Sequence, residues 1–377
     1  MNPTELIGPP SPLGYPAPYW FLVIFKVLGF TLHMVPMHLW FVGILLAMGL
    51  AQWGGPQAQR WSARLMRQMP VVIALGINFG IVPLLFTQVA YYRVFYPATI
   101  LMAWPWFLII VLLTLAYYGV YLYVTGLKDD AVLTPLKRAA GWSSAILFVV
   151  MGFLFSNGFT LMTNLHEWPQ IWQSTSVAGA PLGTTLNTSD PTLWPRWLMM
   201  IGLALTTVAA YTVFDAGVFA IRESPQYKSW ATSFAFKLYT VGMIWFAVMG
   251  SWYVFGSWSP DVREQMFTGM SLPLTVLTAV GPGLPWLLIL AQRQQITQTL
   301  AILMALAQFG VLGLNAISRQ IVQNIELSKF LDVTAEPVNL QLSPLIVFLV
   351  LFVVGLGVVA WMLQKVLQAE RQPIRGS

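Results

Sequence analysis

Residues Tyr19 to Leu50 read YWFLVIFKVLGFTLHMVPMHLWFVGILLAMGL and contain one lysine, Lys26, as their only Lys, Arg, Asp or Glu residue. A helix rises about 1.5 Å per residue, so roughly 20 apolar residues cross a hydrocarbon core of about 30 Å. This stretch is therefore long enough to span a membrane. It also contains two histidines, His33 and His38, on either side of Pro36. The first predicted span therefore carries candidate functional residues.

The composition of the whole chain agrees with a membrane protein. Of its 377 residues, 57% are apolar and 8% are charged, with a mean hydropathy of +0.70, whereas soluble domains carry about 25% charged residues. The chain has no cysteine, which excludes a c-type haem or iron-sulfur cluster held by its own thiolates. Its net charge is +6, but the basic residues lie in short loops, so no nucleic-acid partner is expected.

Further segments of the same kind follow, and none alternates with the period of two that a β-barrel needs. The sequence therefore predicts an all-α polytopic membrane helix bundle with about nine transmembrane helices. The predicted spans are Tyr19 to Leu50, Pro70 to Tyr92, Thr99 to Val124, Arg138 to Asn164, Arg196 to Ile221, Trp230 to Phe255, Leu272 to Gln292, Thr297 to Ser318 and Pro344 to Leu363.

Most of the 19 Lys and Arg residues lie in the odd-numbered connections and the C-terminal tail. Because basic loops stay in the cytoplasm, we expect an outer N-terminus and a cytoplasmic C-terminus in a bacterial inner (cytoplasmic) membrane. Residues 1–377 are predicted to form a single integral-membrane domain. Residues 1–18 form an outer Pro-rich segment, and residues 165–195 form the longest outer loop, which is expected to cap the bundle or dock a partner.

The two histidines of the first span are five residues apart, an offset of about 140° around a helix. The two side chains therefore point in different directions and cannot bind one metal ion together. His33 lies about half way through the span and is a candidate axial haem ligand. On the residues alone, a neutral histidine bonded to a neighbouring helix is the favoured alternative. Pro36 should kink the helix and release carbonyls that either imidazole can satisfy.

Charged residues inside spans need a partner or a route to water. Lys26 and Lys237 are each about seven residues from a predicted span start, so long stems are expected to carry their ammonium groups to the headgroups. Asp215 is expected to form a structural ion pair with Lys237 or Arg222.

Amide side chains inside the spans are interpreted mainly as interhelical hydrogen-bond partners, and a polar pocket or proton path is the alternative. Arg319 is the exception, because a guanidinium near the outer boundary can hold a haem propionate, a quinone oxygen or a partner's carboxylate. The amides are Asn78, Gln88, Asn157, Asn164, Gln308, Asn315, Gln320, Gln323 and Asn324.

Taken in order, the spans resemble subunit I of the bd-type quinol oxidases, a haem-bearing family with nine helices and this orientation. The resemblance covers nearly the whole chain but depends on short motifs. They are FTLHMVPMHLWFVGILLAM at residues 30–48, ALGINFGIVPLLFTQ at 74–88, Ser-Asn-Gly-Phe at 156–159 and Ser-Arg-Gln-Ile at 318–321. The family has a haem-ligating histidine in its first helix, and His33 is offset from it by one residue when Gly43 is the anchor.

The resemblance also implies losses. The family holds its low-spin haem with a histidine opening the fifth helix and a methionine in the seventh, where this chain has Met199 or Met200 and Ala279. Two family glutamates fall near Thr114 and Ala316, which can neither bind iron nor relay a proton. The outer quinol-binding loop shrinks to about residues 256–271. A three-haem oxygen-reducing centre is therefore not expected.

The leading expectation is an integral-membrane subunit of a bacterial respiratory electron-transfer complex. It would anchor, or relay electrons between, quinone and cytochrome partners, as part of an oxidoreductase complex rather than a catalyst alone. It would hold one haem b through His33 or His38, with Met34, Met37 or Met162 as second ligand, or no haem. Expected partners are other membrane subunits, cytochrome c-type subunits on the outer face, and lipid or quinone.

Two alternatives from other classes remain. A membrane transporter with discontinuous helices would use the span breaks suggested by Pro83, Pro105, Pro282 and Pro285. No internal repeat relates the two halves of the chain, which disfavours it. A haem-free membrane scaffold is the other alternative, distinguished by co-purifying cytochromes without haem absorbance of its own.

Overall fold

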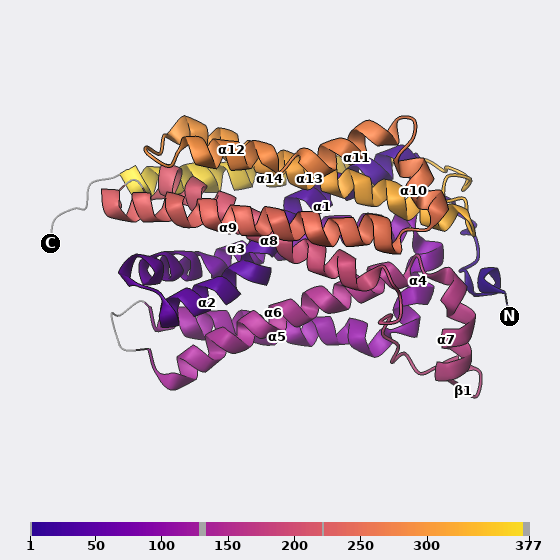
Figure 1. Ribbon diagram of the computed structural model, residues 1–377. Coiled ribbons are helices and arrows are strands. Elements are labelled where there is room, and N and C mark those ends of the chain that lie inside the picture. Colours follow the sequence, from indigo (N-terminus) through magenta and orange to yellow (C-terminus); the bar gives the residue numbers. More distant parts are fainter. Residues whose placement is uncertain (1, 128–132, 221, 372–377) are drawn as a thin grey trace.

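A computed structural model describes residues 2–127, 133–220 and 222–371. Within these residues, nine helices are long and apolar enough to cross a membrane, which confirms the predicted all-α polytopic bundle. The helices run side by side, and the two chain ends lie at opposite ends of the bundle (Figure 1). We call these ends the N-side and the C-side. Ile221, the predicted end of the fifth span, lies outside the described residues.

The first span is one continuous rod with a change of helix type inside it. It consists of α1 (Tyr19–His38), the π-helix η2 (Leu39–Gly43) and α2 (Ile44–Trp53). Pro36 lies within α1, just before η2, and all five residues of η2 are buried. Proline removes a helical hydrogen bond and π-turns accommodate such local misfits, so the expected disturbance appears as a π-turn.

The remaining spans follow the predicted order. They are α3 (Pro56–Ala90), α5 (Ala103–Thr125), α6 (Pro135–Leu161), α8 with π-helix η4 (Leu193–Phe214 and Asp215–Phe219), α9 with π-helix η5 (Pro225–Ser251 and Trp252–Ser257), α11 with α12 (Ser271–Val280 and Gly283–Ala291), α13 (Gln298–Ser328) and α14 (Leu342–Arg371).

Short elements at the N-side were not evident from hydropathy, which detects only long apolar runs. They are η1 (Pro3–Leu6), α4 (Tyr92–Leu101), η3 (Leu165–Glu167), α7 (Trp168–Thr175), the hairpin of β1 (Ser176–Val177) and β2 (Ala180–Pro181), and α10 (Pro260–Met266).

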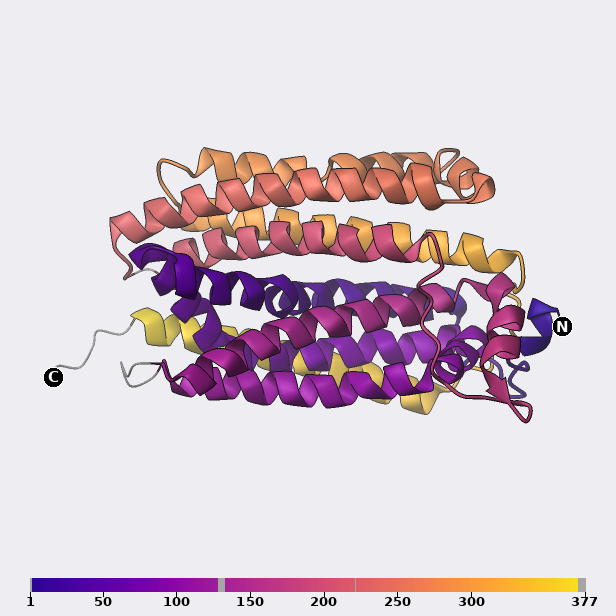
Figure 2. The same ribbon diagram turned by 60° about the horizontal axis from the view of Figure 1, so that its bottom comes forward.

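Helix pairs form the framework of the bundle. α1 packs on α3, α5 on α6, and α8 on α9, and Figure 2 shows α9, α11 and α12 as a separate layer beyond α8. Glycine allows α8 and α9 to approach closely: a Cβ on Gly202 would lie only 2.6 Å from the backbone nitrogen of Phe246. Small residues allow this approach between membrane helices.

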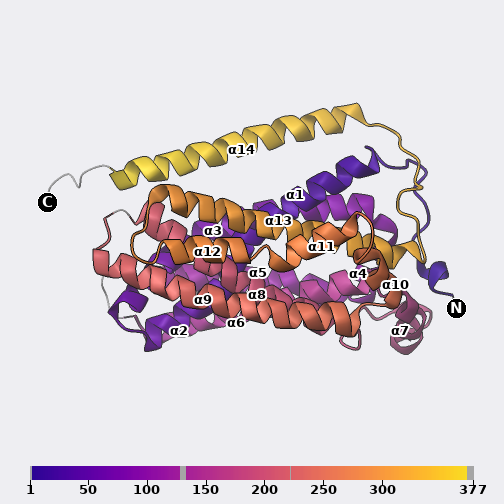
Figure 3. The same ribbon diagram turned by 45° about the horizontal axis from the view of Figure 1, so that its top comes forward.

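α14 lies along the edge of the bundle (Figure 3). Its apolar stretch in the structure is Leu342–Met362, close to the predicted Pro344 to Leu363, and none of the most apolar window of this stretch is buried. Phe348 contacts the rings of Phe25 and Phe86 at centroid distances of 5.1 Å, which ties this helix to α1 and α3. The other faces of α14 are open to lipid or to another protein.

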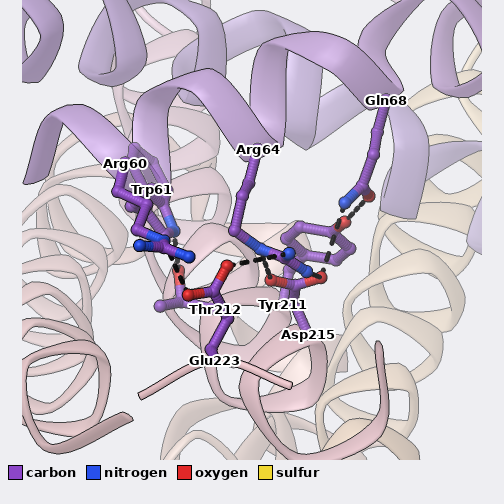
Figure 4. A network of polar contacts seen from close by, with 8 residues as sticks. All are labelled: Arg60, Trp61, Arg64, Gln68, Tyr211, Thr212, Asp215 and Glu223. Carbon is purple, nitrogen blue, oxygen red and sulfur yellow. Dashed lines mark hydrogen bonds and ion pairs between the residues drawn. The ribbon is translucent and has the colours of Figure 1, made fainter. Parts of the chain in front are cut away.

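An ion-pair network holds α3 to η4 on the C-side (Figure 4). Arg64 donates from Nε and Nη2 to the two Asp215 oxygens at 3.0 and 2.9 Å, and from Nη1 to Glu223 at 3.3 Å. Arg60 pairs with the other Glu223 oxygen at 2.6 Å. The partner of Asp215 is therefore Arg64, which corrects the expectation of Lys237. The side chain of Lys237 is exposed.

We expect Arg64→Ala to destabilise the protein strongly. The Asp215 side chain is 4% exposed, so losing its bidentate partner leaves a buried carboxylate uncompensated, at a cost of about 3–5 kcal/mol. The measurement is thermal unfolding in detergent. Arg60→Ala is the matched control, because Arg60 is 57% exposed and should shift the midpoint much less. Equal shifts for the two variants would contradict the central role of the Arg64–Asp215 pair.

Candidate functional site

His33 sits at a close contact between α1 and α3. Its Nδ1 lies 2.8 Å from the Gly76 carbonyl oxygen, and because a carbonyl only accepts, Nδ1 carries the proton. A Cβ on Gly80 would come within 2.8 Å of the imidazole ring, so glycine makes room for it. A histidine that binds a metal through one ring nitrogen usually donates the N–H of the other to a carboxylate, a carbonyl or water. Nε2 of His33 is therefore the unprotonated ring nitrogen, which is the form that binds a metal.

His38 is held differently. Its Nδ1 lies 2.9 Å from the Thr207 hydroxyl oxygen, and that hydroxyl donates to the Leu203 carbonyl at 2.9 Å. His38 must therefore donate from Nδ1, which leaves Nε2 unprotonated. This Nε2 is buried without a hydrogen-bond partner. Since no surface of Nε2 is accessible even to water, an iron atom would fit only after the surrounding core repacked.

The expected role of Pro36 is wrong in one respect. Neither imidazole bonds a carbonyl released next to Pro36, because His33 reaches α3 and His38 reaches α8. The two rings also point to different neighbours, as their five-residue spacing predicted. Each is bonded to a neighbouring helix, so the favoured interpretation from the residues is confirmed for their hydrogen bonds.

A cavity lies between the helices in the N-side half of the bundle, and we call it the central cavity. It has a volume of about 460 Å³ and is lined by residues of α1, α6, α8, α9, η5, α11 and α13. Met199 and Met200 from α8 and Ala279 from α11 all face it. The positions at which the resemblance implied two lost haem ligands thus share one cavity.

The central cavity does not fit a haem with two axial ligands. Its lining includes no histidine, and Ala279 has no donor atom. Met34, Met199, Met200 and Met266 bring thioethers to the lining, but methionine most often fills space in apolar cores. His33 is not among the lining residues, although Met34 beside it in sequence is, so the structure does not bring the suggested His33–Met34 pair to one site.

Two arginines line the central cavity toward its N-side. The Arg319 guanidinium lies 4.9 and 5.2 Å from the ring centroids of Phe30 and Phe159. Arg196 lies 5.6 Å from the Tyr253 ring centroid. Its side chain is 10% exposed, and its Nη1 is 4.0 Å from Glu326 Oε2. Arg319 was expected from the sequence to bind an acidic or polar group, whereas Arg196 was expected only to begin the fifth span.

A polar network lies beside Arg319, between α1, α13 and Tyr91. Lys26 donates from Nζ to the amide oxygens of Gln320 and Gln323 at 2.8 and 2.7 Å. Its ammonium is thus held inside the bundle, and the expected route to the headgroups is wrong for Lys26. The Tyr91 hydroxyl of the same network donates to the Asn324 amide oxygen at 2.6 Å.

The amide interpretation is confirmed where hydrogen bonds cross between helices. Gln308 of α13 accepts from the Tyr239 hydroxyl of α9 at 2.7 Å and donates to Thr206 and Thr207 of α8 at 3.1 and 3.2 Å. Asn78 instead bonds the Ala74 carbonyl in its own helix. Asn315 lines the central cavity.

The loop of residues 165–195 caps the N-side end of α6. Asn187 donates from its backbone N–H to the Asn157 side chain at 2.8 Å and from its side chain to Thr160 at 3.1 Å. Its amide oxygen accepts from Asn164 at 2.8 Å. These bonds confirm the capping role expected for this loop, and they place a folded surface on the N-side.

The helix breaks that would favour a transporter are fewer than expected. Pro83 lies inside the unbroken α3, and Pro105 lies in the first turn of α5. Pro282 is at the junction of α11 and α12, and Pro285 is near the start of α12. Only the seventh span is interrupted by proline in the described chain.

Comparisons with known proteins agree with this architecture. No protein-family model and no curated protein sequence matches the chain. Among solved structures, the bd oxidase from Geobacillus thermodenitrificans is similar, with a TM-score of 0.64 and 10% sequence identity over 96% of this chain and 100% of that one. Identity this low carries no information on chemistry, since one fold serves many functions. The chain is a multi-pass membrane protein with a bd-oxidase-like fold.

Proposed function

We propose that this chain is an integral-membrane subunit of a bacterial respiratory electron-transfer complex, located in the inner membrane with its N-side outward. There it anchors, or relays electrons between, quinone and cytochrome partners. The observation that carries the proposal is the match to bd oxidase along 96% of the chain, together with a histidine in the first span whose hydrogen bond suits metal ligation.

His33 is the residue that we assign to a haem b. Its Nδ1–H is fixed on the Gly76 carbonyl, and Gly80 gives the ring its space, so Nε2 is oriented before any ligand arrives. A bound haem would supply one-electron transfer at this position. The buried His38 instead links α1 to α8 through Thr207. We assign it a structural role.

The surfaces left open suit partner subunits. The span of α14 has no buried residue in its apolar window, and its contacts to α1 and α3 use only one side, through Phe348 and Phe352. A second membrane subunit would cover the open faces of this helix. On the N-side, the loop of residues 165–195 is the surface that we assign to cytochrome c-type partners.

We expect His33→Ala to abolish a haem b signal in reduced-minus-oxidised spectra of the purified native complex. His38→Ala should keep that signal, because His38 Nε2 has no accessible surface. The two variants are matched controls for each other, and subunit composition must stay constant in both. Unchanged spectra in both variants would remove histidine ligation by this chain, and a complex without haem would favour the scaffold alternative.

We also expect the chain to co-purify with at least one redox subunit when it is extracted from its native membrane in mild detergent. Mass spectrometry of the intact assembly identifies the subunits. Replacing Val350 and Val354 on the open side of α14 by Trp should displace a membrane partner, whereas Trp replacements at Ile110 and Leu115 on α5 should not. All four side chains are exposed. A purified chain without any redox partner would contradict the proposed function.

A further inference from the structure

The central cavity has more positively than negatively charged side chains around it, and its three cations are partly buried. Arg196 and Arg319 line it, and Lys26 is bonded to Gln320, the neighbour of Arg319. The Lys26 partners are neutral amides. Three cations therefore lie in the N-side half of the bundle, within or beside one hollow.

Two carboxylates lie near these cations; Glu326 attracts Arg319 electrostatically, but neither carboxylate forms a salt bridge with it among the described residues. Glu326 approaches Arg196, with 4.0 Å between Oε2 and Nη1, and both atoms are buried without a hydrogen-bond partner. Asp190 acts on Arg196 electrostatically, but its oxygens accept from the Asn187 side chain and the Thr192 N–H at 2.9 and 2.7 Å.

Arg319 contacts aromatic faces instead of an acid. Its guanidinium lies over Phe30 and Phe159, and no salt bridge involves it in the described part of the chain. The attraction of aromatic faces for a cation is weaker than the penalty for an unpaired charge in hydrocarbon. An anion in the cavity would remove that penalty.

The rest of the lining suits an acyl chain. Leu203, Phe246, Val276 and Val280 are among its apolar members, and a volume of about 460 Å³ lies in the range of ligand-binding cavities, about 300–1,000 Å³. α11 forms one wall and has no buried residue.

We propose that the central cavity binds an acidic amphiphile, with its carboxylate or phosphate on Arg196 and Arg319 and its acyl chain among the apolar side chains. Both guanidiniums offer planar forks of donors that match either acid group. The inference goes beyond the proposed function and holds whether or not His33 carries a haem.

Two other occupants satisfy the cavity less well. A haem would bring acidic groups, but the lining offers no imidazole and has Ala279 on the α11 wall. A neutral quinone would accept hydrogen bonds from an arginine but would bring no negative charge. The charge imbalance distinguishes an acidic lipid from both.

The first test compares ligands of equal chain length and different charge. The full-length protein in phosphatidylcholine nanodiscs is titrated with oleate or oleyl alcohol, and bound molecules are counted by native mass spectrometry. We expect one oleate per chain and at least tenfold weaker binding of oleyl alcohol. A second arm exchanges the nanodisc lipid for phosphatidylglycerol. Retention of that lipid in place of oleate would identify a membrane phospholipid as the natural source.

The second test removes the charge of Arg319. Arg319→Gln should weaken oleate binding about tenfold or more, because charge-assisted hydrogen bonds contribute about 1.5–3 kcal/mol. Arg319→Lys should retain part of the binding. Lys237→Gln is the control, because it makes the same charge change at an exposed residue outside the cavity lining.

Several results would overturn the proposal. Equal binding of oleate and oleyl alcohol would show that charge does not select the ligand, and unchanged binding in Arg319→Gln would remove the arginine from the site. Haem or neutral quinone found in the cavity of the purified protein would also contradict the proposal, because neither is an acidic lipid. If Arg319→Gln fails to fold, the comparison of oleate with oleyl alcohol on the unmodified chain still tests whether the cavity selects an acidic ligand.

Discussion

The structure depends on the absence of water in the bilayer core, because every polar group placed there must find its partner within the protein or in a ligand. The bundle meets this constraint with bonds to carbonyls of the same helix, as at Asn78 and Thr87, and with bonds that cross between helices. His38 reaches Thr207, Gln308 connects α13 to α8 and α9, and Arg64 neutralises Asp215. Arg319 stands out because the same requirement is left unmet there by the chain itself.

The charged side chains are balanced in the C-side network and unbalanced around the central cavity on the N-side. On the C-side, Arg60 and Arg64 face Asp215 and Glu223, so two positive charges meet two negative ones. That network is complete without a ligand and suits a fixed joint between α3 and η4. The N-side has an excess of cations around a hollow with an apolar lining. The C-side network, whose charges balance, thus suits a structural contact between helices, and the central cavity, whose charges do not, suits a binding site.

The bundle could be predicted from sequence because hydropathy reports directly on the solvent that each span meets. The same signal stopped at polar residues, so α3 was predicted from Pro70 although its amphipathic first turns begin at Pro56. Site geometry was less accessible. Nothing local indicates that Arg196 and Arg319, far apart in sequence, share a cavity, or that amides rather than water hold Lys26. Those facts depend on how α1, α8 and α13 pack, which a single sequence does not reveal.

The π-turn at Leu39–Gly43 bears on how this chain is aligned with distant relatives. A π-turn holds one residue more than an α-helical turn, so a helix can absorb a single inserted residue there while the segments on both sides keep their facing directions. His33 lies before that turn, and Gly43 is its last residue. Against a relative that lacks this π-turn, gap-free numbering from Gly43 would displace every residue before Leu39 by one position, and superposed backbones would give the sounder register for the first helix.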